Sequence, residues 1–142
     1  MRRIHLVHLA CAVAVFMGVI SARAELMAEE GIGPFNVVYV LGEQKIALAD
    51  AWWATLYTYA KDGNGVSNCT GPCTDAWPPL LANATDTPFE AFVIVERPDG
   101  KRQWAHRGRP LYTSVLDKAK GDANGQGIDD AWFVVEVEAH DM

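Results

Sequence analysis

Residues 56–62 read Leu-Tyr-Thr-Tyr-Ala-Lys-Asp, and residues 111–117, 55 positions later, read Leu-Tyr-Thr-Ser-Val-Leu-Asp. The alignment extends without a gap to Asp-Ala-Trp at 75–77 and 130–132 and contains seven identities. Tyrosine and tryptophan are among them, and such uncommon residues rarely align by chance. Because self-similarity at a fixed spacing is the signature of a repeated structural unit, the sequence predicts a duplicated domain.

Strands are indicated around these motifs by runs of β-branched and aromatic residues between turn residues. The turn residues Pro98-Asp99-Gly100 predict a hairpin between two of the runs, whereas 44–60 fits either a strand pair or a helical turn. We therefore predict a mainly β fold, a small duplicated β-sheet or sandwich domain with pseudo-twofold halves, after an N-terminal signal helix. The expected strands are 36–41, 91–96, 102–106 and 132–138.

The N-terminus has the pattern of a secretory signal peptide, with Arg2-Arg3, an apolar run over 4–20 and the small-residue cleavage site Ala22-x-Ala24. A membrane anchor needs about 20 apolar residues, so no stable membrane span is expected once the signal is removed. We predict a periplasmic or secreted bacterial protein. Lipid anchoring through Cys11 is the weaker alternative, because the residues before it fit a lipid-attachment box poorly.

The expected organisation follows from the signal and the repeat. Residues 1–24 are the signal peptide, 25–34 a mobile leader, and 35–142 a single duplicated domain. Repeat 1 covers about 35–82 and repeat 2 about 90–138.

The charge balance restricts the partners. The chain has 12 Lys and Arg against 18 Asp and Glu, a net charge of −6. Residues 1–24 contain basic but no acidic side chains, so their removal would make the net charge more negative. Nucleic acid and anionic membrane both require basic protein surface, so neither is an expected partner. An envelope protein or a small ligand fits better.

Cys69 and Cys73 would be the only cysteines left after signal cleavage. An even pair in an oxidising compartment predicts a disulfide. The spacing and the absence of a following histidine do not fit the C-x-x-C-H signature of c-type haem. A redox-active pair is an alternative, although such pairs usually have C-x-x-C spacing.

The combined motifs resemble a known group. Residues 56–62 match Y-x-[FWY]-x-x-D, and they are followed by Cys69-x-x-x-Cys73, Trp77-Pro78-Pro79-Leu80, the run 103–112, a Gly-Asp…Gly-x-Gly loop and Trp132. Over roughly 35–136 the chain resembles the bacterial secreted-repeat family, predicted lipoproteins with the Yx(FWY)xxD motif. The resemblance implies a periplasmic or cell-surface protein and brings no catalytic mechanism.

Three departures from the family pattern stand out. The lipidation signal is absent, Ser114 replaces the aromatic residue of the second motif, and Trp53-Ala54 replaces the usual glycine before T-L-Y.

The motif residues Tyr57, Asp62, Tyr112 and Asp117, together with Tyr59, are the first candidates for a site. In the structural interpretation each tyrosine hydroxyl bonds to a backbone or carboxylate partner, and each aspartate holds the following Gly-rich loop. In the functional interpretation, carboxylate and phenolate oxygens bind calcium or an iron-type metal.

The second Gly-rich loop partly matches a calcium-loop template, with Asp122, Asn124 and Asp130 at ligand positions. Phe133 stands where the template requires a bidentate glutamate, so the loop is not an EF-hand. A looser metal site stays open, and a metal ion is the only cofactor that the sequence leaves open.

His106 and the tryptophans are the remaining candidates in the sequence. His106 is more simply explained as a packed residue than as a ligand or base, since no G-x-S-x-G elbow accompanies it. The five tryptophans are expected to form the core, with Trp77, Trp104 and Trp132 as its structural aromatics.

These features favour a non-enzymatic periplasmic or cell-envelope accessory module that binds an unknown ligand. One alternative is a dedicated metal-binding protein that uses the Tyr/Asp/Gly loops. Another is a redox partner or enzyme that uses Cys69 and Cys73 or His106.

Overall fold

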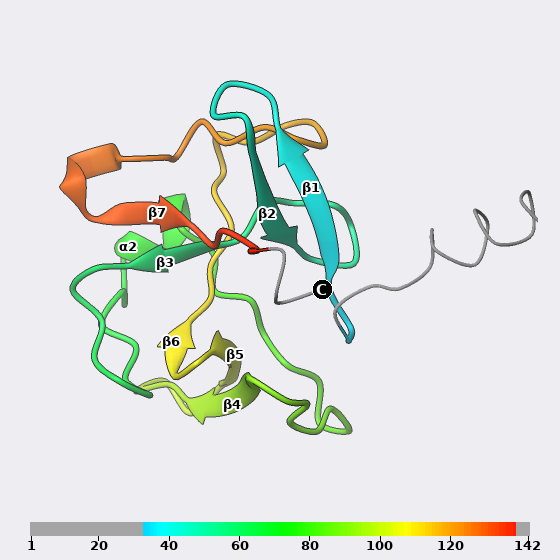
Figure 1. Ribbon diagram of the computed structural model, residues 1–142. Helices are drawn as coiled ribbons and strands as arrows, with labels where there is room; N and C mark the ends of the chain where they lie inside the picture. The colour runs from blue at the N-terminus through cyan, green and yellow to red at the C-terminus, as the bar shows by residue number, and fades with distance from the viewer. Residues whose placement is uncertain (1–32, 139–142) are drawn as a thin grey trace, which may run out of the picture. The chain divides into compact units, whose positions relative to one another are not determined.

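The computed structural model describes residues 33–138, which belong to one compact unit (Figure 1). The predicted signal peptide and most of the predicted leader lie outside these residues. None of the helices in the described part is long and apolar enough to cross a membrane. The elements are β1 (Asn36–Val40), β2 (Lys45–Ala49), β3 (Tyr57–Tyr59), α2 (Cys73–Ala76), β4 (Phe92–Glu96), β5 (Arg102–His106), β6 (Arg109–Pro110), the 3-10 helix η1 (Ile128–Asp130) and β7 (Trp132–Val134).

The strands form small antiparallel sheets, β1-β2, β3-β7 and β4-β5-β6, which confirms the mainly β prediction. The hairpin around Pro98-Asp99-Gly100 is confirmed, with Val93 opposite Ala105. The ambiguous stretch 44–60 contains β2 and β3. Between them the chain turns at Asp50, whose carboxylate accepts hydrogen bonds from the amides of Trp52 and Ala54.

The last strand is shorter than predicted. β7 ends at Val134, and the chain then leaves β3 to pair with β2, where Ala47 and Glu136 form an isolated bridge. The alternation of apolar and polar residues over 132–138 therefore spans two pairing partners, which the pattern alone does not distinguish.

The two repeats exchange strands about a local twofold relation. At its centre, Tyr57 and Tyr112 bond to each other through two backbone hydrogen bonds, with N···O distances of 2.8 and 2.9 Å. β3 of repeat 1 pairs with β7 of repeat 2, and Tyr112 of repeat 2 forms a bridge with Pro79 of repeat 1. Each L-Y-T motif thus pairs with the segment just after the tryptophan of the other repeat, Trp132 for repeat 1 and Trp77 for repeat 2.

Other backbone bonds repeat with the same 55-residue shift. The amide of Val135 donates to the carbonyl of Leu56, and the amide of Leu80 donates to the carbonyl of Leu111, both at 2.9 Å. The shift that aligns the sequences therefore also relates the hydrogen bonds. The duplicated fold with pseudo-twofold halves is confirmed.

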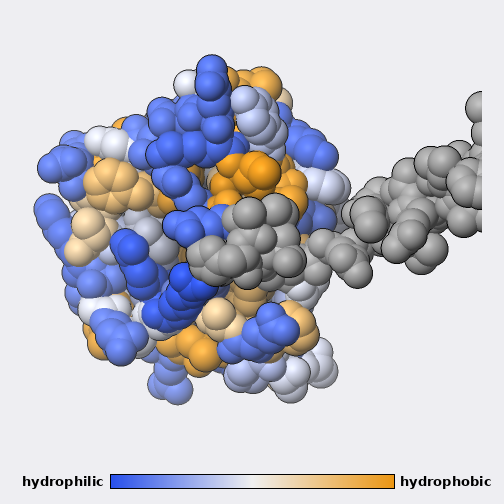
Figure 2. All heavy atoms as spheres, viewed as in Figure 1, coloured by the Kyte–Doolittle hydropathy of each residue, from blue (hydrophilic) through white to orange (hydrophobic). Residues whose placement is uncertain are grey.

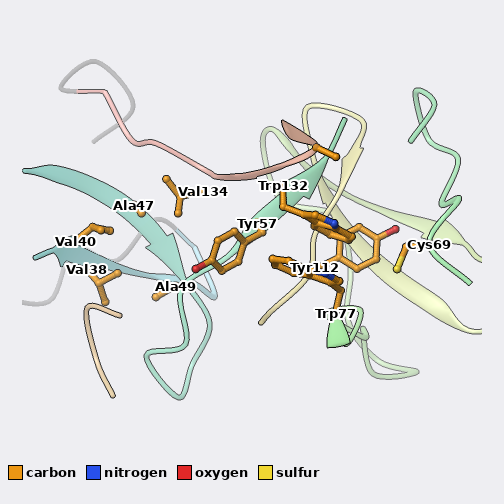
Figure 3. Packing of buried hydrophobic residues seen from close by; sticks show 11 residues of the cluster. Val38, Val40, Ala47, Ala49, Tyr57, Cys69, Trp77, Tyr112, Trp132 and Val134 are labelled. Atoms are coloured by element: carbon orange, nitrogen blue, oxygen red, sulfur yellow. The ribbon is translucent and has the colours of Figure 1, made fainter. Parts of the chain in front are cut away.

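The core has an aromatic centre on this twofold relation (Figure 3). The rings of Trp77 and Trp132 stack at 3.9 Å with an angle of 3° between their planes. Tyr57 meets the edge of Trp77 and Tyr112 the edge of Trp132, and the two hydroxyls point in opposite directions. Four large rings thus join the repeats, and each contributes apolar area at little cost in side-chain entropy.

The prediction that the tryptophans form the core holds for three of the five. Trp104 lies in a second buried cluster, beside Phe35. Trp52 is 87% exposed and Trp53 39%, so the prediction is wrong for these two. Both lie in the exposed turn 51–53, where the Asp50 carboxylate accepts hydrogen bonds from the amides of Trp52 and Ala54.

Candidate functional site

The motif tyrosines and aspartates meet across the repeats. The Tyr57 hydroxyl donates to Oδ2 of Asp117 at 2.7 Å, and the Tyr112 hydroxyl donates to Oδ2 of Asp62 at 2.9 Å. The sequence groups each tyrosine with the aspartate of its own repeat, whereas the structure bonds it to the aspartate of the other. The strand exchange explains the difference, because it carries each motif into the partner repeat's loop.

Each aspartate also holds its own loop. The second oxygen of Asp62 accepts from the amide of Asn68 at 2.7 Å, and that of Asp117 accepts from the amide of Asn124 at 2.8 Å. Both asparagine side chains donate back to the carbonyl just before the aspartate. Asn68 was missed from the sequence, although an asparagine six or seven residues after each motif aspartate was a signal that could have found it.

The environment of these groups favours neutral tyrosines. Burial raises the pKa of Tyr112 to about 12, and burial together with the bond to Asp117 raises the pKa of Tyr57 well above its ordinary value. Burial also raises the pKa of Asp62, against the opposing effect of the bond from Asn68. The tyrosines are therefore hydrogen-bond donors near neutral pH, which fits a structural part better than a phenolate metal ligand.

A buried arginine forms a further polar network that the sequence did not reveal. Arg97 is 3% exposed and donates to Oγ of Ser67 at 2.6 Å, to Oε1 of Gln103 at 2.7 Å and to the carbonyl of Cys69 at 2.9 Å. Ser67 in turn contacts the Tyr112 hydroxyl at 2.6 Å. Its Nε also pairs with the half-exposed carboxylate of Asp99 at 3.4 Å. That local pair alone does not mark Arg97 as buried, because the partners of its other nitrogens come from the other repeat and from the next strand.

Cys69 and Cys73 form the predicted disulfide, with their Cα atoms 5.3 Å apart. Cys69 directly follows Asn68, as Gly125 follows Asn124 in repeat 2. In repeat 1 this position is thus held by the disulfide. In repeat 2 it is held by close packing, since a Cβ atom at Gly125 would lie 2.5 Å from the Trp77 ring.

The residues of the calcium-loop template do not converge on one site. The Asp122 carboxylate accepts from the amides of Lys118 and Ala119, and these bonds lower its pKa. Asn124 is bonded to Asp117, and Asp130 is exposed on η1. Within residues 33–138 no three His, Cys, Asp or Glu side chains are grouped so that they could hold a metal ion.

The surface between β3, β6 and β7 is hollowed, and hydrophilic residues gather there in Figure 2. Two hollows, of about 410 and 270 Å³, share Arg107 and Arg109 as lining residues. Tyr59 lines the first, and its ring stacks on Trp132 at 4.3 Å. His106 lines the second, with its ring 4.9 Å from that of Phe92.

Neither arginine was predicted from the sequence as a site residue. Arg107 and Arg109 surround Gly108 at the turn between β5 and β6, so a signal existed in the basic residues next to His106. We call the two hollows together the arginine hollow.

Comparison with known proteins gives one family. A family model described as a secreted repeat of unknown function matches twice, at residues 47–81 and 93–136, which together make up more than half of the chain. No curated protein and no solved structure matches. The two matches coincide with the two structural repeats and support an extracytoplasmic location. The chain therefore belongs to the family of secreted repeats of unknown function.

Proposed function

We propose that the protein is a non-enzymatic accessory module of the bacterial cell envelope that binds a ligand on its surface. The observation that supports this most is the crossed pairing of the motif residues. Tyr57 bonds to Asp117 and Tyr112 to Asp62, so the groups that define the family motif hold the two repeats together. Chemistry that needs these groups free would compete with the fold.

Binding then depends on the surface that the motif supports. The arginine hollow lies over β3, which contains the two tyrosines of the repeat 1 motif, and Tyr59 forms part of its wall. Pockets that bind small molecules typically combine apolar walls with a few placed polar groups. Tyr59, Phe133 and the two arginines supply this combination.

The proposed location is the periplasm or the exterior. Residues 1–24 act as a cleaved signal in this proposal, and 35–142 functions as one duplicated domain. The disulfide is compatible with an oxidising compartment. N-terminal sequencing of the exported protein tests the cleavage: a first residue of Glu25 supports it, and an acylated Cys11 contradicts it.

The experiment that separates this proposal from the metal and redox alternatives uses protein purified from the periplasm without added metal or chelator. Metal content, a thermal melt with and without EDTA, and thiol titration of the folded protein are measured together. We expect no stoichiometric metal, an unmoved melt and no reactive thiol. A stoichiometric metal whose removal lowers the melting temperature would establish the metal alternative, and rapidly exchanging Cys69 and Cys73 thiols would establish the redox one.

A further inference from the structure

The two repeats differ at one equivalent turn. Trp53 and Gly108 are 55 residues apart, and both have left-handed backbone conformations, with φ of 68° and 78°. Each turn contacts the loop of the other repeat. The loop residues in contact, Lys120 and Gly65, are also 55 residues apart. The Lys120 ammonium lies 3.2 Å from the centre of the Trp53 ring, whereas the amide of Gly65 donates to the carbonyl of Gly108 at 2.7 Å.

This difference leaves space on one side of the molecule. In repeat 1 an indole ring and an ammonium group fill the contact between turn and loop. In repeat 2 the glycine has no side chain, and the contact is made by the backbone and Asn64. The arginine hollow lies at this second contact, lined by Asn64, Arg107 and Arg109.

The hollow is held in one shape before any ligand arrives. The amide of Gly65 bonds to the carbonyl of Gly108 at 2.7 Å and fixes the turn against the loop, and the Asn64 side chain lies against Gly108. The Tyr59 wall is fixed by its stack on Trp132. A site whose groups are already positioned loses less entropy on binding.

The charges at the hollow favour an anion although the chain as a whole is acidic. Arg109 is exposed and takes part in neither of the two salt bridges of the described residues. The nearby carboxylates have their own donors: Asp62 is bonded to Asn68 and Tyr112, and Glu136 to Lys45. Glu136 is thus already paired with the Lys45 ammonium, and the exposed guanidinium of Arg109 adds a positive charge to the hollow.

We propose that the arginine hollow binds a small oxyanion, a carboxylate or phosphate group, through Arg107 and Arg109, with an apolar part of the ligand against Tyr59. Guanidinium groups match these anions because their parallel N–H bonds fit two oxygens at once. The inference rests on the proposed binding function and names the class of its ligand.

The test is a two-dimensional NMR titration of the exported protein with phenylacetate, acetate and inorganic phosphate. We expect phenylacetate or phosphate to shift the amide signals of Tyr59, Gly108 and Arg109. Tighter binding of phenylacetate than of acetate supports an organic acid that uses the apolar wall. Tighter binding of phosphate than of either carboxylate supports a phosphate-bearing ligand.

Two charge-removing variants make the assignment specific. Arg109→Gln should weaken binding about tenfold, the loss expected for a charge-assisted hydrogen bond. Lys101→Gln removes an exposed cation next to the other end of β5 and should leave the affinity unchanged. Equal affinities of the two variants would overturn the proposal.

Phenylacetamide, which is neutral, and phenethylamine, which is cationic, are titrated in parallel. They separate binding at the hollow from its preference for anions. If a neutral or cationic probe shifts the same amides and the anions do not, the hollow is a binding site and the anion class is wrong. If no probe of any charge shifts them, the hollow binds none of these chemistries. Both the inference and the assignment of binding to this surface then fall.

Discussion

At the scale of single residues, the motif aspartates each bond to groups from both repeats. Asp117 accepts one bond from Tyr57 of the other repeat and one from the amide of Asn124 in its own loop. A carboxylate can accept both bonds because it has only acceptor sites. An amide of the same shape cannot, since its nitrogen would face a donor.

Asp117→Asn should therefore destabilise the fold by about 1–3 kcal/mol, the usual cost of leaving a buried polar group unsatisfied. Urea denaturation followed by tryptophan fluorescence measures the change, with and without EDTA. Asp129→Asn is the matched control, because Asp129 is exposed and asparagine tolerates its positive φ of 55°. A loss of stability that appears only in the absence of EDTA would point instead to a bound metal.

The buried tyrosines predict a fall in stability at high pH. An unfolded tyrosine has a pKa of about 10, whereas burial raises the pKa of Tyr112 to about 12 in the folded protein. The folded state therefore keeps a proton that the unfolded state loses. Its contribution to stability is complete below pH 10 and is lost as the pH rises through 12.

Denaturation at several pH values between 9 and 12 checks this dependence. Tyr112→Phe should be less stable at neutral pH, because Asp62 and Ser67 lose a partner. Its stability should also fall less steeply above pH 10. Identical slopes for the variant and the wild type would show that Tyr112 does not set the alkaline limit.

At the scale of elements, the sequence predicted what depends on local pattern. β1, β4, β5 and the hairpin between the last two follow from apolar runs and a Pro-Asp-Gly turn. The crossed tyrosine pairs and the burial of Arg97 did not follow, because their partners lie 50 or 60 residues away for the tyrosines and 28 to 30 for the arginine contacts in repeat 1. Spacing within one motif cannot show which repeat's loop it enters.

The Gly-rich loop of repeat 1 is held by a disulfide, whereas that of repeat 2 is held by close packing at Gly125. The stability of the protein should therefore be sensitive to a larger side chain at Gly125. Gly125→Ala would place a methyl group 2.5 Å from Cη2 of Trp77 and 3.1 Å from Cε1 of Tyr57. Both rings are buried and fixed, so we expect a loss of about 1–3 kcal/mol from overpacking.

Gly42→Ala is the control for this substitution, since a Cβ atom there meets nothing within 4 Å. Thermal melts of both variants, followed by near-ultraviolet circular dichroism, report the stacked tryptophans directly. An unchanged melt for Gly125→Ala would mean that the ring of Trp77 can move aside. The aromatic centre would then be softer than its geometry indicates.

At the scale of the whole molecule, neither repeat has its core alone. The stack of Trp77 on Trp132 and the backbone pair of Tyr57 and Tyr112 each take one residue from each half. The family model matches both halves, so in this chain the two matched repeats together complete one structure. The arginine hollow lies at one of the two equivalent turns, where Gly108 stands in place of Trp53.

This mutual dependence predicts that separate halves will not fold. Polypeptides covering 25–82 and 83–142 should each lack the near-ultraviolet signal of stacked tryptophans, because β3 is then without β7 and Tyr112 without Pro79. Mixed in equal amounts they should recover the signal, since every bond between the repeats is noncovalent. A second fragment carrying Trp132→Ala should fail to restore it. If the first fragment alone is a folded monomer by light scattering and circular dichroism, the bonds between the repeats are dispensable, and the motif must be explained by its own loop instead.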